Sequence, residues 1–120
     1  MGRIFLLAPS FEKSYKRLKK KYSSIETDLE SFKKAYVENP DIGEDLGEGF
    51  RKVRIAIKSK NRGKRGGARI ITYDDYDDIV IKAETGIVVL VEIYDKSEIS
   101  TLSKNEYEKG LRDFLANQSK

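Results

Sequence analysis

The sequence predicts a single α+β domain, in which helices pack on one face of an antiparallel β-sheet. Two stretches with the helical spacing of apolar residues come first, and stretches with the two-residue spacing of strands follow. The length of 120 residues fits one domain covering residues 1–120. The expected architecture is an N-terminal strand, a helical hairpin on one face of the sheet and a short C-terminal helix.

The first 40 residues predict the strand and the hairpin. Residues 3–6 form an edge strand, and Ser10 is available as the N-cap of the first helix. The second helix is expected to begin with a capping box from Ser23 to Glu26 and to end before Pro40. Apolar residues repeat at spacings of three and four in both helices: Phe11, Tyr15, Leu18 and Tyr22, then Ile25, Leu29, Phe32 and Tyr36.

After a glycine-rich loop, the apolar spacing changes to that of strands. Residues 52–58 alternate, with Val53, Ile55 and Ile57 on one face and basic side chains on the other. Residues 68–73 form the next strand, and residues 79–83 could resume the pairing. The most apolar stretch, residues 87–94, is the expected central strand. A second capping box, from Ser103 to Glu106, begins the last helix.

Two missing residue types restrict the chemistry. The chain has no cysteine and no histidine, so it lacks thiolate ligands and the commonest general base. We expect no metal and no cofactor, and any catalysis must use Lys, Arg, Tyr, Asp, Glu, Ser or Thr. No apolar run approaches the length of a membrane span, so we expect a cytoplasmic protein with no membrane partner.

The charge is unevenly distributed. Nine of the 24 basic residues fall between Arg51 and Arg69, a stretch without a single acid, whereas the rest of the chain carries all 20 acidic residues. Such a stretch is often only a solvated surface. Because ordinary surfaces mix the two signs, the concentration favours a phosphate-binding surface and a nucleic-acid partner.

Two motifs in this order resemble a known family. "GKRGGARII" and "VLVEIYDKSE", after a helical hairpin and a "GFRKVRI" strand, are similar to the RelE/HigB toxins of bacterial type II toxin–antitoxin modules, in the RelE/ParE superfamily. The resemblance covers about Phe5 to Phe114. It implies a microbial-RNase-like, RelE-type sheet and a metal-independent endoribonuclease that enters the ribosome and cuts mRNA. It also implies a cognate antitoxin encoded beside it.

The resemblance also suggests the site. RNA supplies its own nucleophile, the ribose 2′-hydroxyl, so the protein needs an acid, a base and cations for the phosphorane. Arg69 is expected to stabilise the pentavalent phosphate. Lys52 and Arg54 are candidates for base and phosphate clamp, and Lys96 for acid or second clamp. The residues expected to contact the RNA backbone are Lys58, Lys60, Arg62, Lys64 and Arg65. Tyr94 either stacks on a base or packs at the end of its strand.

Several alternatives remain open. A ParE-like toxin shares the fold but poisons DNA gyrase without cutting RNA, and a non-catalytic relative would only bind RNA or protein. The six basic residues of the first helix are either a solubilising face or a docking surface for ribosomal RNA. The aspartates from Asp74 to Asp78 form an exposed turn or modulate access to the basic surface.

Overall fold

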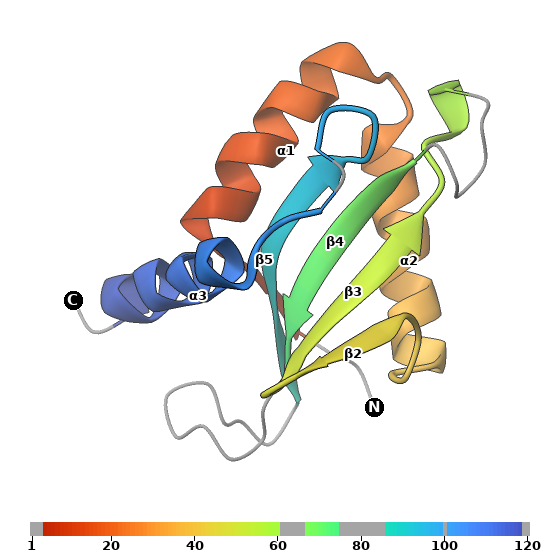
Figure 1. Cartoon of the computed structure of the whole chain (residues 1–120). Coiled ribbons are helices and arrows are strands. Elements are labelled where there is room, and N and C mark those ends of the chain that lie inside the picture. The colour runs from red at the N-terminus through yellow and green to blue at the C-terminus, as the bar shows by residue number, and fades with distance from the viewer. Residues whose placement is uncertain (1–3, 61–66, 75–85, 100, 119–120) are drawn as a thin grey trace.

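One five-stranded sheet organises the chain in the computed structural model, which describes residues 4–60, 67–74, 86–99 and 101–118 (Figure 1). The elements follow in the order β1 (Ile4–Leu7), α1 (Pro9–Lys21), α2 (Ile25–Glu38), β2 (Glu44–Gly47), β3 (Phe50–Ile55), the 3-10 turn η1 (Lys58–Lys60), β4 (Ala68–Tyr73), β5 (Ile87–Asp95) and α3 (Lys104–Gln118). This is the predicted α+β class, with helices and sheet in one unit.

The strands lie in the order β1-β5-β4-β3-β2. The pairs β2–β3, β3–β4 and β4–β5 are antiparallel, as expected, but β1 runs parallel to β5. The N-terminal strand is at an edge, as predicted. The prediction of a central position for residues 87–94 was wrong, because β4 is the middle strand and β5 lies between β4 and β1. The predicted strand over residues 79–83 lies outside the described residues.

The helical hairpin of α1 and α2 lies on one face of the sheet, as predicted, but α3 lies on the other face, so the helices are not confined to one face. On the first face, the apolar sides of α1 and α2 bury Val53, Ile55 and Ile70. On the second face, α3 packs against Phe50 and Tyr73. Strands β4 and β5 are apolar on both faces, so a hairpin on one face alone would leave the other in water. Within the described ranges, no helix is long and apolar enough to cross a bilayer.

One of the three predicted helix caps is present. The capping box that starts α3 forms as predicted, because Ser103 and Glu106 exchange hydrogen bonds of 3.3 and 3.2 Å. α1 begins at Pro9, so Ser10 lies inside the helix and its hydroxyl donates to the Val91 carbonyl oxygen at 2.6 Å. α2 has Ser24 as its N-cap, and that hydroxyl donates to Asp28 at 2.7 Å. Ser10 thus has a tertiary partner in place of the predicted cap, and the N-cap of α2 is one residue after the predicted Ser23.

Candidate nucleic-acid interface

The second face of the sheet carries a row of polar side chains across three strands. Arg54 on β3 is opposite Arg69 on β4, and Arg69 is opposite Tyr94 on β5. Residues opposed on neighbouring strands project from the same face, so these side chains form one row. Lys52 lies on the same face, two residues before Arg54. The structure therefore brings together four of the predicted site residues.

Burial differs sharply along the row. Arg54 is exposed and Lys52 is half-buried, whereas Arg69 is only 3% exposed and Tyr94 only 2%. The Tyr94 ring belongs to the apolar core beneath α3, which corresponds to the packing role rather than to stacking on a base. The accessible end of the row is therefore Arg54, with Arg69 behind it.

Two like charges lie next to each other in this row. Burial, and after it the positive charge of Arg54, lowers the pKa of Arg69. A guanidinium remains charged at neutral pH even so. Arg69 donates one hydrogen bond to the Ala68 carbonyl oxygen at 3.3 Å. An anion bound between Arg54 and Arg69 would relieve their repulsion, and a phosphate with several oxygens could accept from both.

Acids from other parts of the chain approach several of the cations that have no acid near them in the sequence. Lys52 Nζ is 3.4 Å from Glu44 Oε1 on β2, and Arg51 Nη1 is 4.0 Å from Asp45 Oδ2. Both acids are more than 60% exposed, so water screens these pairs and they contribute little stability. The Lys52–Glu44 pair does limit the positive potential at the β2 end of the face, whereas Arg51 and Asp45 project from the other face. The most positive part of the row is thus at Arg54 and Arg69.

Lys60 is not part of this row. Its side chain is 11% exposed, and its Nζ donates to Asp95 Oδ1 at 2.9 Å. Asp95 belongs to the group of contacts between α1, η1 and the end of β5. Lys60 therefore serves as the partner of a buried carboxylate. The ion pair with Asp95 explains why Lys60 is present in the basic stretch, and no RNA contact is needed to explain it.

The other predicted residues are dispersed. Lys58 is exposed on η1, where its backbone N–H donates to Asp28 at 3.2 Å. Lys96 is exposed on the turn after β5, and its N–H donates to the Gly67 carbonyl oxygen at 3.2 Å, which places it beside the start of β4. Arg62, Lys64 and Arg65 lie outside the described residues, as do Asp75 to Asp78.

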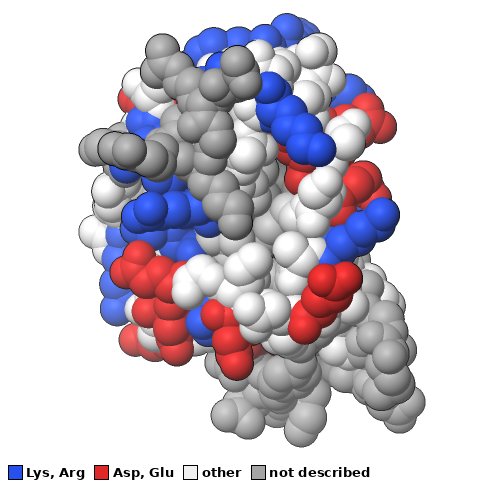
Figure 2. All heavy atoms as spheres, turned by 90° about the vertical axis from the view of Figure 1, so that its right-hand side faces the viewer, with Lys and Arg blue, Asp and Glu red and all other residues white. Residues whose placement is uncertain are grey.

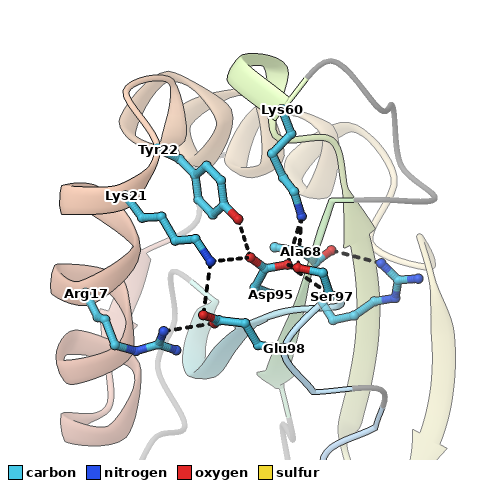
Figure 3. A network of polar contacts seen from close by, with 9 residues as sticks. Arg17, Lys21, Tyr22, Lys60, Ala68, Asp95, Ser97 and Glu98 are labelled. Carbon is cyan, nitrogen blue, oxygen red and sulfur yellow. Dashed lines mark hydrogen bonds and ion pairs between the residues drawn. The ribbon is translucent and has the colours of Figure 1, made fainter.

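No pattern in the sequence indicated the network around Asp95. Figure 3 shows this fully buried carboxylate accepting hydrogen bonds from Lys60, from the Tyr22 hydroxyl at 2.5 Å and from Ser97. Burial alone would raise the pKa of Asp95, but these hydrogen bonds outweigh it and hold that pKa well below its ordinary value. Lys60 and Tyr22 lie 35 and 73 residues away from Asp95 in the chain, so no local pattern reveals these two partners.

A second basic surface lies along α1. Four cations at helical spacing line a hollow of about 600 Å³ beside the half-buried Glu92 of β5: Lys13, Lys16, Arg17 and Lys20. Burial raises the pKa of Glu92, although hydrogen bonds from Ser14 and from the Ile93 N–H oppose this. The ionised form of Glu92 is thus disfavoured in the folded protein.

Replacing Glu92 by glutamine is expected to raise the melting temperature at pH 7. A carboxyl whose pKa is raised by folding destabilises the protein as pH rises above its unfolded value of about 4.3. Glutamine keeps an oxygen for the Ile93 N–H and carries no charge. Thermal unfolding at pH 7 and below pH 4 checks this, because the gain should disappear in acid. An equal gain at both pH values would contradict the assignment.

A comparison of the chain with models of known protein families finds no match. Among the residues that the structure describes, no three acidic side chains are grouped as a metal site would require. What the protein does must therefore be argued from the row itself.

Proposed function

We propose that the protein is the toxin of a type II toxin–antitoxin module and cleaves mRNA on the ribosome. The observation that carries this proposal is the cross-strand pair of Arg54 and Arg69 on one sheet face, with Lys52 beside it. The α+β fold is of the class that the resemblance to RelE/HigB toxins implies. The supposed substrate is a single-stranded RNA segment that lies across β3 and β4.

The two arginines suit the transition state of RNA self-cleavage. Attack of the 2′-hydroxyl on the adjacent phosphorus forms a phosphorane with additional negative charge, and the bond to the 5′ oxygen then breaks. Arg69 is held by the sheet and donates from a largely buried position, where its charge acts more strongly than it would in water. Arg54 would clamp the same phosphate from the exposed side.

Lysines supply the proton transfers in this scheme. Lys52 lies on the face of the row and, as the neutral amine, would take the proton of the 2′-hydroxyl, whereas Lys96, as the ammonium, would give one to the leaving 5′ oxygen. Lys52 is oriented by its contact with Glu44, which keeps its Nζ near the strand. Neither step requires histidine, of which the chain has none.

Mapping of mRNA 5′ ends after induction in cells tests this function. The wild type should produce new ends within translated messages, at a fixed position within the codon, and Arg54→Ala should not. Arg112→Ala removes an exposed arginine from α3, far from the row in sequence, and should cut as the wild type does. Intact messages with induction of the DNA-damage response would instead indicate a gyrase poison. Intact messages and no growth defect would indicate a non-catalytic binding protein.

Binding of single-stranded RNA should weaken as salt rises. Contact of two phosphates, one with Lys52 and one shared by Arg54 and Arg69, predicts a slope of about −1.4 in the logarithm of the binding constant against the logarithm of salt. Arg54→Ala should lower the magnitude of that slope by about 0.7. Fluorescence anisotropy of a labelled oligonucleotide at several salt concentrations measures both. A flat dependence for the wild type would rule out phosphate contact by this face.

A further inference from the structure

Lys96 lies at the centre of a tight turn that Asp95 closes. Asp95 is the last residue of β5, and its Oδ1 accepts from the Ser97 N–H at 2.9 Å and from the Ser97 hydroxyl at 2.7 Å. A carboxylate that accepts from the N–H two residues later fixes the backbone of the residue between them. The Asp95 carbonyl oxygen also accepts from the Glu98 N–H at 3.0 Å. One residue therefore holds the turn around Lys96 closed.

The turn is continuous with the sheet. The Lys96 N–H donates to the Gly67 carbonyl oxygen at 3.2 Å, one step beyond the pairing of Asp95 with Ala68. Gly67 is packed against β3, because a Cβ at this position would overlap the Ile55 carbonyl oxygen. The ladder between β4 and β5 thus extends to Lys96, and the backbone that it pairs with there is itself fixed.

The Asp95 carboxylate and the Lys96 side chain lie on opposite faces, since successive residues of a ladder alternate. Asp95 points to the first face, where the Tyr22 hydroxyl of α1 reaches it (Figure 3). The alternation places Lys96 on the second face with Tyr94, as a diagonal neighbour of Arg69 within reach of a long side chain. Basic side chains gather on this face, which lies to the left in Figure 2.

The first face fixes the Asp95 carboxylate from two directions. Tyr22 at the end of α1 donates to it at 2.5 Å, and Lys60 of η1 donates at 2.9 Å. The carboxylate is fully buried, so no bulk water competes for its oxygens. Glu98 ties the same turn to α1 through an ion pair of 2.8 Å with Arg17. The carboxylate therefore keeps one orientation, and the turn keeps one conformation with it.

We propose that Asp95 is the positioning residue of Lys96, the proton donor of the cleavage reaction; this inference rests on the proposed function. In that reaction the 2′ oxygen bonds to phosphorus and gives its proton to the Lys52 amine. The bond from phosphorus to the 5′ oxygen breaks, and the Lys96 ammonium passes a proton to that oxygen. The products are a 2′,3′-cyclic phosphate and a 5′-hydroxyl. Asp95 touches no RNA, but it holds the Lys96 ammonium beside the phosphate bound by Arg69.

An mRNA with sulfur in place of the 5′ oxygen at the cleaved phosphate separates positioning from folding. A thiol is far more acidic than an alcohol, so a sulfur leaving group needs no proton donor. On programmed ribosomes, Asp95→Ala with Lys60→Met should slow single-turnover cleavage of the ordinary mRNA about 10²-fold relative to the wild type. Cleavage of the sulfur mRNA should slow less than about threefold. Lys60→Met is included because the lysine would otherwise be left buried and unpaired.

Asp95→Asn with Lys60→Met is the matched rescue. The amide oxygen still accepts from the Ser97 N–H, so this variant should cut the ordinary mRNA about tenfold faster or more than the alanine variant. Asp113→Ala with Lys109→Met removes an exposed ion pair of the same composition from α3 and should cut both mRNAs as the wild type does.

Tyr22→Phe provides a milder change that leaves no buried charge. It removes one donor to Asp95 and should slow only the ordinary mRNA, by about threefold to tenfold. Circular dichroism at the assay temperature checks that each variant is folded.

Three results would overturn the inference, and they are distinguishable. Equal slowing of both mRNAs by folded Asp95 and Tyr22 variants, when Lys96→Ala slows only the ordinary mRNA, removes Asp95 as a positioning residue and leaves the proposed function intact. Equal effects of Lys96→Ala on the two mRNAs would remove Lys96 as the proton donor. Failure of the wild type to cut either mRNA would overturn the proposed function itself.

Discussion

Replacing Arg69 by lysine is expected to slow mRNA cleavage about 10²–10³-fold, with little loss of RNA binding. Lysine keeps the positive charge that attracts the phosphate, but it lacks the planar group that donates to two oxygens at once. The loss should therefore appear in the rate of the chemical step under single-turnover conditions, whereas the binding constant for an uncleavable RNA should change less than about threefold.

Folding must be controlled in this experiment, because Arg69 is 3% exposed and lies in the middle strand. Circular dichroism should give a melting temperature close to that of the wild type. Arg112→Lys makes the same chemical change at an exposed position of α3, outside the strands that carry the row. A cleavage rate of Arg69→Lys equal to that of Arg112→Lys would remove Arg69 from the proposed chemistry.

Replacing Asp95 by alanine should lower the free energy of unfolding by about 3–5 kcal/mol. Asp95 is fully buried and Lys60 is 11% exposed, so removal of the carboxylate leaves an ammonium largely out of water. It also removes the acceptor of the Tyr22 hydroxyl and of Ser97. Urea unfolding of the two proteins measures the difference.

Glu98→Ala is the matched control for this network. Glu98 pairs with Arg17 and Lys21, both about half exposed, so its loss should cost less than about 1 kcal/mol. A double variant, Asp95→Asn with Lys60→Met, should be more stable than Asp95→Asn alone, because no unpaired charge remains. Equal effects of Asp95→Ala and Glu98→Ala would show that the buried pair of Asp95 and Lys60 contributes no more to stability than the exposed ion pairs of Glu98.

The same carboxylate adds to the loss of stability in acid. Its folded pKa is depressed, so its contribution is fully present above the unfolded value of about 3.9 and is lost as pH falls below that value. The stability difference between wild type and Asp95→Asn should therefore shrink between about pH 4 and pH 2. A difference independent of pH in this range would contradict the depressed pKa.

The strands were predictable where the sequence alternates. Val53 and Ile55 point into the core as their spacing predicted, and the register of β3 with β4 then places Arg54 beside Arg69. A hairpin of neighbouring strands is a local arrangement, so its face can be read from the sequence. The parallel pairing of β1 with β5 is not local, because the paired residues are separated by most of the chain.

Contacts between distant segments account for what the sequence left out. Ser10 and Ser23 look like helix caps in isolation. In the fold, the Ser10 hydroxyl donates to the Val91 carbonyl oxygen, and the N-cap of α2 is Ser24, whose hydroxyl accepts from the Ser59 N–H. Lys60 looks like one more cation of the basic stretch until Asp95 is placed beside it. The basic stretch therefore offers fewer cations to an anionic partner than the sequence suggests, because Lys60 is paired with the buried Asp95.

The position of β5 has a consequence for biosynthesis. Among the described strands it is the last in the chain, yet it lies inside the sheet, where it is the partner of β1 and one of the two partners of β4. Until Asp95 has emerged, β1 has no neighbour in the sheet and β4 can pair only with β3. In a nascent chain the row of Arg54, Arg69 and Tyr94 is therefore incomplete until β5 has been synthesised, although Arg54 and Arg69 can already pair in the β3–β4 hairpin.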